Sequence, residues 1–220
     1  MLTGVIAWHR ALCKLQQMTS RFYFDQAILN RASNLRHNSP FERGTDNLNS
    51  VFIPVWRDKS LFLNGDVPKA VMLKGEEGQW LSENATQIIF LGIKEGTMFF
   101  CADISHLENV DGTPLPAKTV FVDLRSLATS IEPEAAGFLA YARALAYWNR
   151  THLYCGRCGS PTESKKCGHE RHCTSKSCEC IHFPRTDPAV IMLVTHPSED
   201  KCLLGPVSYT HLRAHETEAD

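Results

Sequence analysis

Six of the nine cysteines in this 220-residue chain lie between Cys155 and Cys180, just before an apolar stretch at residues 189–194. Four of them form two spaced pairs, Cys155 with Cys158 and Cys173 with Cys178. Two such pairs, each on a tight turn, can bring four sulfurs to one ion, and four thiolates leave a tetrahedral Zn²⁺ no open position. The spacing therefore predicts a structural zinc ribbon in which these four cysteines are the ligands.

Other side chains of the same loop compete for the ion. Cys180 is an alternative to Cys178 as the fourth ligand, and Cys167, His169 and His172 lie within reach. A disulfide framework is disfavoured, because the cysteines are clustered and odd in number and no signal peptide precedes them. A reducing, intracellular compartment is the expected setting.

Composition excludes several broad classes. The chain is 43% hydrophobic and 21% charged, with a formal net charge of −1, so it has no overall attraction for nucleic acid or anionic membranes. It contains no apolar run of about eighteen or more residues, so no membrane helix is predicted and no membrane partner is expected. Residues 1–22 have basic residues but no acidic ones, as in a mitochondrial presequence, and the alternative is an unstructured extension before Met18.

The middle of the chain predicts an α+β fold. Between residues 23 and 130, short apolar runs separated by turn residues indicate a small, mostly antiparallel domain: 51–56, 61–63, 88–91, 98–101 and 120–122. The first two runs are expected to form a hairpin. A connecting helix is predicted over 131–150, with Pro133 in its first turn and one buried face formed by Phe138, Tyr141, Leu145 and Trp148.

Several motifs together resemble the NADH pyrophosphatases of the Nudix hydrolase superfamily. They are residues 142–148, the segment from His152 to Gly159, the stretch from His182 to Val194, and residues 201–205. Upstream, residues 29–36, 90–92 and 99–103 resemble the N-terminal Nudix-like domain of that family. The gap between the second pair of cysteines resembles the eukaryotic, peroxisomal-type branch.

The resemblance implies hydrolysis of the phosphoanhydride of NADH, NAD or NAD-capped RNA to nicotinamide mononucleotide and AMP, or to the decapped RNA. It also implies Mg²⁺ or Mn²⁺ held by glutamates of the Nudix domain, and a homodimer. Phe183 stands where family members usually have a nucleotide-contacting tyrosine, so it is the candidate substrate-binding residue, and packing inside the ribbon is its alternative role. A peroxisomal or cytoplasmic location is expected, with the mitochondrion as the alternative.

The glutamate signature of the family (Gly, five residues, Glu, seven residues, Arg-Glu, then Glu-Glu) does not occur in this sequence. We therefore expect no catalytic residues among these 220 and no NADH hydrolysis by them alone. The expected organisation is an extension at 1–22, a Nudix-like domain at 23–130, a helix at 131–150, a zinc ribbon at 151–184, the first hairpin of a truncated Nudix domain at 185–205 and a non-native tail at 206–220.

Two other interpretations belong to different classes. A non-enzymatic zinc-ribbon module that binds protein or RNA has the same cysteine spacing, and a short pseudoenzyme isoform paired with a full-length protein has the same motifs. The glutamate signature, sought downstream of codon 205, separates the enzyme from the binding module. Sequencing the transcript through that codon tests the expected tail.

Overall fold

The computed structural model describes residues 28–37, 50–127, 130–185 and 198. The chain divides into two compact units, Met1–Pro184 and Arg185–Asp220, and every described helix and strand belongs to the first. The predicted extension at 1–22, the hairpin between 189 and 204 and the tail at 206–220 lie outside the described residues apart from Ser198.

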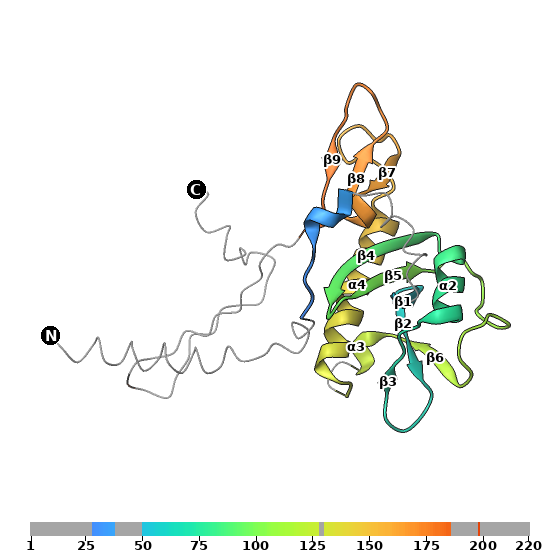
Figure 1. Cartoon of the computed structure of the whole chain (residues 1–220). Helices are drawn as coiled ribbons and strands as arrows, with labels where there is room; N and C mark the ends of the chain where they lie inside the picture. Colours follow the sequence, from blue (N-terminus) through green and yellow to red (C-terminus); the bar gives the residue numbers. More distant parts are fainter. Residues whose placement is uncertain (1–27, 38–49, 128–129, 186–197, 199–220) are drawn as a thin grey trace. The chain divides into compact units, whose positions relative to one another are not determined.

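One sheet forms the body of the first unit (Figure 1). Its strands are β1 (Val51–Trp56), β2 (Lys59–Leu63), β3 (Lys69–Ala70), β4 (Gln87–Lys94), β5 (Thr97–Asp103) and β6 (Thr119–Val122). The path runs β3-β2-β1-β5-β4, and β6 pairs with β2. Only β1 and β5 pair in parallel, so the sheet is mostly antiparallel, as the sequence predicted.

The predicted hairpin is the turn between β1 and β2. Trp56 faces Lys59 across the ladder, which leaves Arg57 and Asp58 as a two-residue loop. Both have positive φ, 50° and 65°, the conformation that matches the twist of two antiparallel strands. The sequence prediction is confirmed, although Lys59 and Ser60 belong to β2 and not to the loop.

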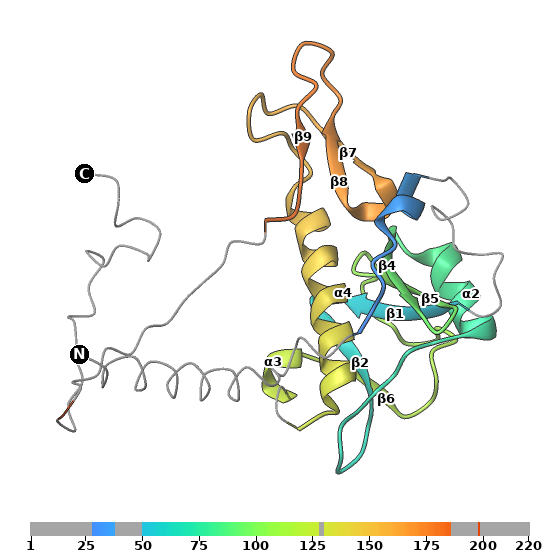
Figure 2. The same ribbon diagram turned by 60° about the vertical axis from the view of Figure 1, so that its left-hand side comes forward.

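Each face of the sheet carries its own hydrophobic cluster, because alternate residues of a strand point to opposite faces. In β1, Ile53 and Val55 pack with the helix α4 (Pro133–Thr151), whereas Phe52 packs with Leu81 of the helix α2 (Gly75–Asn84) on the other face. Figure 2 shows α4 and α2 on either side of the sheet. A short helix, α3 (Leu124–Leu127), precedes α4.

Helix α4 begins at Pro133, two residues after the predicted start at residue 131. Glu132 is its N-cap, and the Glu132 carboxylate accepts hydrogen bonds from the backbone N–H groups of Glu134 and Ala135. The predicted apolar face is buried, with Phe138 stacked on Phe99 of β5 at 4.7 Å between ring centroids. Tyr141 is only half-buried, and the guanidinium of Arg31 lies 3.6 Å from its ring centroid. The stripe is therefore core, as predicted.

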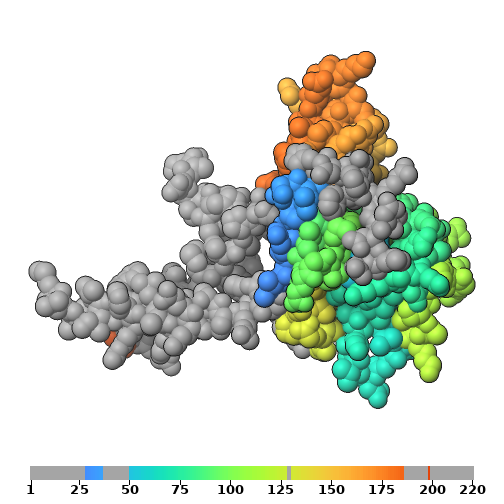
Figure 3. Space-filling view, viewed as in Figure 1, coloured from blue at the N-terminus to red at the C-terminus, as the bar shows by residue number. Residues whose placement is uncertain are grey.

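After α4 the chain forms a three-stranded antiparallel ribbon of β7 (Thr162–Lys165), β8 (Glu170–Cys173) and β9 (Ile181–His182). The space-filling view shows it standing out from the sheet (Figure 3). A short 3-10 helix, η3 (Lys166–Gly168), joins β7 to β8 and contacts β4 and the 3-10 helix η1 (Ser33–His37). A Cβ on Gly168 would lie 2.7 Å from Cγ1 of Ile89, so only glycine allows this close approach between ribbon and sheet.

Candidate metal centre

The first cysteine knuckle lies just beyond the end of α4. The N–H of Cys155 donates to the carbonyl of Ser160, and the N–H of Gly159 donates back to the carbonyl of Cys155, at 2.8 Å in each case. Gly159 has a φ of 74°, a conformation that costs glycine little. These bonds curl the chain so that Cys155 and Cys158 present their sulfurs to the same point.

The second knuckle follows β8. The N–H of Cys173 donates to the carbonyl of Cys180, and the N–H groups of Cys178 and Glu179 both donate to the carbonyl of Ser175. Glu179, the residue after the second cysteine, has a φ of 50° and so occupies the place that Gly159 has in the first knuckle. Four residues separate Cys173 from Cys178, two more than in the first pair, and a turn over residues 175–178 accommodates them.

The four predicted sulfurs come together. Those of Cys155, Cys158, Cys173 and Cys178 all lie within 4.8 Å of one another. The Sγ atoms of Cys155 and Cys178 are 3.8 Å apart, and those of Cys158 and Cys173 are 3.5 Å apart. A tetrahedral ion with Zn–S bonds of about 2.3 Å requires sulfurs about 3.8 Å apart, so this cluster fits a structural Zn²⁺.

Backbone amides favour negative charge on these sulfurs. Burial raises the pKa of Cys155, but the N–H groups of Arg157 and Cys158 outweigh it, and the net shift is downward. Hydrogen bonds from the hydroxyl and the N–H of Ser160 lower the pKa of Cys158 to about 6. Cys173 and Cys178 likewise accept from the N–H groups of Ser175 and Cys180, two residues further along the chain.

The pKa values of the two cysteine pairs shift in opposite directions: those of Cys155 and Cys158 are lowered, and those of Cys173 and Cys178 are raised. The N–H of Ser175 lowers the pKa of Cys173, yet burial and the bond that its thiol makes to Cys158 raise it to about 12. The pKa of Cys178 is also raised, because burial and its bonds to Cys158 and Cys155 outweigh the N–H of Cys180. A divalent ion among the four sulfurs would replace these protons, since thiolates are the form that binds metal.

The other candidate ligands have different surroundings. Cys167 is buried in the cluster on the α2 face of the sheet, and its Sγ lies 3.7 Å from the carbonyl of Arg36. His169 is buried with Nε2 2.6 Å from the carbonyl oxygen of Phe90, and His172 pairs with the carboxylate of Glu170. Among the described residues, these three side chains therefore lie outside the cluster of four sulfurs.

Cys180 lies near the cluster but belongs to a second potential ligand group, with Cys155 and His182. Nε2 of His182 is 3.2 Å from Sγ of Cys155, close enough for an N–H donor to support the thiolate. Sequence reasoning missed His182. Its only signal was its position two residues after Cys180, which places it on β9 beside the first knuckle.

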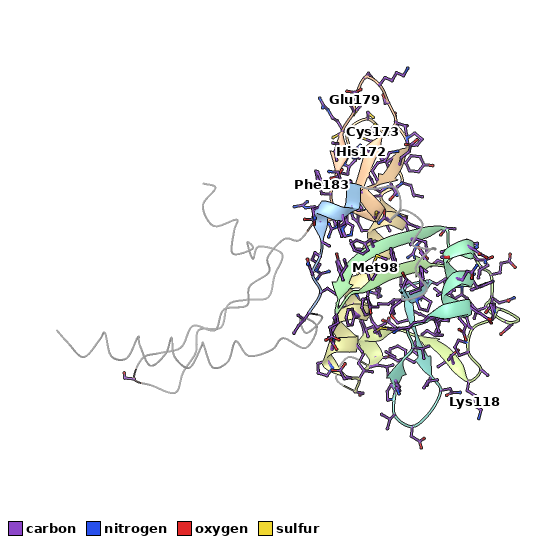
Figure 4. The ribbon with its side chains drawn as sticks, in the orientation of Figure 1. Met98, Lys118, His172, Cys173, Glu179 and Phe183 are labelled. Carbon is purple, nitrogen blue, oxygen red and sulfur yellow. The ribbon has the colours of Figure 1, made fainter. Side chains whose placement is uncertain are left out.

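The candidate substrate residue Phe183 follows β9 directly. Its side chain is 58% exposed, so it does not pack inside the ribbon. Figure 4 places it at the side of the ribbon, with His172 and Cys173 within the ribbon itself. Tyr154 and Ile181, at the two edges of the ribbon, are also exposed.

No helix among the described residues has both the length and the apolar character needed to cross a membrane.

The fold is a Nudix-like sheet domain followed by a zinc ribbon, and this order defines the class of the chain. Two family models match it in that order. The NADH pyrophosphatase-like rudimentary NUDIX domain matches residues 49–148, and the NADH pyrophosphatase zinc ribbon domain matches residues 150–183. The chain belongs to the zinc-ribbon-containing NADH pyrophosphatase family of Nudix hydrolases.

Similar curated proteins have names from the same family. Nudix hydrolase 19, chloroplastic, of Arabidopsis thaliana is 30% identical in a gapped alignment of 133 positions, which covers 56% of this chain and 30% of the relative. The NAD-capped RNA hydrolase NUDT12 of Homo sapiens is 36% identical in an alignment of 81 positions, which covers 34% of this chain and 18% of the relative. The NAD-capped RNA hydrolase NPY1 of Saccharomyces cerevisiae is 26% identical in a gapped alignment of 242 positions, which covers 85% of this chain and 62% of the relative. The chain thus spans less than a third of the length of the first two relatives.

Proposed function

We propose that this chain is the N-terminal and zinc-ribbon part of an NAD(H) pyrophosphatase. Water would add across the phosphoanhydride of NADH, NAD or an NAD-capped RNA end, and release nicotinamide mononucleotide with AMP or with the decapped RNA. The observation that supports it is the ordered match to the Nudix-like domain and then the zinc ribbon of that family. Two of the similar proteins, NUDT12 and NPY1, have names that state hydrolysis of NAD-capped RNA.

We assign the chemical step to glutamate-bound Mg²⁺ or Mn²⁺ in a Nudix domain that contains the glutamate signature. Such ions neutralise developing phosphate charge and generate the attacking hydroxide. Because these 220 residues lack the signature, the proposed role of this part is to fold, to hold zinc and to offer Phe183 for stacking on a base. The 58% exposure of Phe183 leaves its ring free for that contact.

The test compares two proteins from the same gene, the 220-residue chain and the product of a transcript read beyond codon 205 into a Nudix domain. Each is incubated with NADH and Mg²⁺, and the mononucleotide products are separated by chromatography. We expect products from the longer protein and none from the shorter. Mg²⁺-dependent turnover by the 220 residues, or a longer reading frame without the glutamate signature, would contradict the proposal and favour a binding module.

The zinc assignment has its own test, which does not depend on catalysis. We propose that Cys155, Cys158, Cys173 and Cys178 hold one structural Zn²⁺, supported by the mutual distances of their sulfurs. Elemental analysis of reduced, folded protein should give one zinc per chain. Changing Cys178 to serine should remove most of it, whereas Cys180→Ser should leave it bound; the reverse result would make Cys180 the fourth ligand.

Assembly and location complete the proposal. We propose a homodimer, on the resemblance to the family, and sedimentation of the longer protein should give twice the mass of one chain. We place the protein inside the cell, in the peroxisome or cytoplasm with the mitochondrion as the alternative. One of the similar proteins is named as chloroplastic, so imaging of the tagged longer protein is the measurement that decides the compartment.

A further inference from the structure

A cavity of about 690 Å³ lies between the sheet and the zinc ribbon, away from the cysteine cluster. Its wall combines the start of β4, the end of β5, the last turn of α4 and the segment from β7 to η3. Cavities of about 300–1,000 Å³ are typical of small-molecule sites. The volume therefore suits a ligand the size of a sugar phosphate or a mononucleotide.

The least expected residue in the wall is Arg171, whose side chain is only 5% exposed. Nε donates to Oγ1 of Thr162 and Nη2 to the carbonyl of Thr162, both at 2.8 Å, and Nη1 donates to Oδ1 of Asn149 at 3.4 Å. All three acceptors are neutral. Among the described residues, no carboxylate forms an ion pair with this guanidinium.

A buried charge without a counter-charge is costly, and proteins normally pair it. The guanidinium carries five N–H donors in a planar fork, and the three bonds above leave two of them unused. A fork of this kind matches the oxygens of a phosphate or carboxylate and binds them more strongly than it binds neutral acceptors. The cavity wall thus contains the buried guanidinium of Arg171, which has no carboxylate partner among the described residues.

Two other cations of the wall, Arg150 and Lys165, differ in their pairing. Arg150 forms a two-oxygen ion pair with Asp58, at 2.7 Å to each oxygen, and is compensated. Lys165, at the rim, has only a solvent-exposed pair with Glu163 at 3.2 Å, which contributes little and which a phosphate can replace. Asp103, which is 5% exposed, is the one carboxylate of the wall, and its Oδ1 accepts the N–H of Ser105. Its second oxygen suits a hydroxyl donor on the ligand.

Neutral side chains of the cavity wall hydrogen-bond to one another and to the backbone between these charged residues. The side-chain amide of Gln87 donates to Oδ1 of Asn149 at 2.9 Å and lies 2.6 Å from the hydroxyl oxygen of Ser164. Asn149 is only 1% exposed and donates to the carbonyls of Leu145 and Gly168. This network ties α4, β4 and the ribbon together, so the cavity wall is held in one arrangement.

We propose that this cavity binds a phosphate monoester of a hydroxylated compound, with the phosphate on Arg171 and Lys165 and a hydroxyl on Asp103. The proposal is separate from hydrolysis of NAD(H) and rests only on the cavity and its charges. The same phosphate chemistry can come from a free sugar phosphate or from the 5′-phosphate of an RNA chain.

Calorimetric titration of the zinc-loaded chain with ribose 5-phosphate tests the site, with ribose as the probe that lacks the phosphate. We expect saturable binding of ribose 5-phosphate and none of ribose.

Arg171→Gln should weaken binding by about tenfold or more, because it removes a charge-assisted pair. Lys165→Gln, at the rim, should weaken it by about threefold. Lys176→Gln is the matched control, an exposed lysine of the same ribbon outside the cavity wall, and should change nothing.

A second measurement covers a failure of the Arg171 variant to fold, which its zinc content and circular dichroism would reveal. The side-chain amide signals of Gln87 and Asn149 should shift in the NMR spectrum of the unsubstituted protein as ribose 5-phosphate is added. Binding of a 5′-phosphorylated trinucleotide as well would mean that the site accepts RNA ends, and failure of the trinucleotide would mean a free metabolite. No saturable binding of ribose 5-phosphate, equal binding of ribose, unshifted amides, or equal weakening by Lys176→Gln would each overturn the proposal.

Discussion

At the scale of single residues, the two cysteine knuckles use different side chains for the same backbone turn. Gly159 follows Cys158 with a φ of 74°, and Glu179 follows Cys178 with a φ of 50°. The left-handed conformation costs an L-residue about 1–2 kcal/mol, whereas glycine adopts it readily. The second knuckle therefore contains a strain that the first avoids.

Glu179→Gly should stabilise the protein. Removing the left-handed penalty outweighs the extra freedom that glycine gives the unfolded chain, for a net gain of about 0.5–1 kcal/mol. Urea unfolding of the zinc-loaded protein measures the change. Glu179→Ala keeps the Cβ and serves as the control, which should show no gain; equal stabilisation by both variants would mean that the charge of Glu179, and not its φ, is the cause.

His169 should make the protein less stable in mild acid. Burial, with the nearby charges of Arg36 and Arg31, lowers the pKa of His169 from its usual 6.5 to about 4, although the Phe90 carbonyl and Glu170 act in the opposite direction. Between those pH values the unfolded chain binds a proton that the folded chain does not, so stability falls as the pH falls. The loss between pH 7 and pH 5 is about 2 kcal/mol.

His169→Gln isolates this effect, because protonation of the cysteine ligands is common to both proteins. The variant should lose about 2 kcal/mol less than the unsubstituted protein between pH 7 and pH 5, as measured by urea unfolding. His106→Gln, which replaces an exposed histidine in place of a buried one, is the matched control. An unaltered pH dependence in His169→Gln would show that His169 is not the group responsible.

The residues of the candidate site differ in how far sequence could predict them. Pairs such as Cys155 with Cys158 are local, and spacing alone identifies them as ligands. His182 was missed because its contact with Cys155 depends on the pairing of β9 with β8, a register that no local pattern specifies. Arg171 has no signal in the sequence, since its burial arises from packing of the ribbon on α4.

At the scale of elements, the same distinction explains which strands and helices were predicted. Helix α4 was found because an N-terminal proline and an apolar stripe are both readable in the sequence. Helix α2 was not predicted: it contains Gly75 and Gly78, and its N-cap, Lys74, makes no side-chain hydrogen bond. The parallel pairing of β1 with β5 joins residues far apart in the chain, so strand patterns could not reveal it.

The cap of α4 should contribute measurably to the fold. Glu132 accepts the N–H groups of Glu134 and Ala135 at 3.0 and 2.8 Å, and loss of an N-cap of this kind costs about 1 kcal/mol. Glu132→Ala should therefore lower the free energy of unfolding by about that amount. Glu76→Ala in the first turn of α2, where the N-cap Lys74 makes no side-chain bond, is the control and should cost less. Equal losses would mean that helix-dipole charge, and not the cap, is responsible.

At the scale of the molecule, the ribbon and the sheet have different sources of stability. The sheet has an apolar cluster on each face, whereas the buried residues of the ribbon, Thr162 in β7 and most of β8, are largely polar or cysteine. A structural Zn²⁺ contributes on the order of 10 kcal/mol to folding, which a segment with so little apolar core requires. The ribbon should therefore depend on metal far more than the sheet does.

Removing the metal should unfold the ribbon and leave the sheet intact, because the two parts meet mainly at η3. After chelation, the amides of Cys155, Thr162 and Thr174 should exchange with solvent about 100-fold faster or more, since their ladder depends on the knuckles. The amides of Phe52 and Leu73, which bond across the sheet, should stay protected. Cys178→Ser should reproduce the effect without chelator and Cys180→Ser should not. Equal loss of protection in ribbon and sheet would show instead that the two parts fold as one cooperative unit.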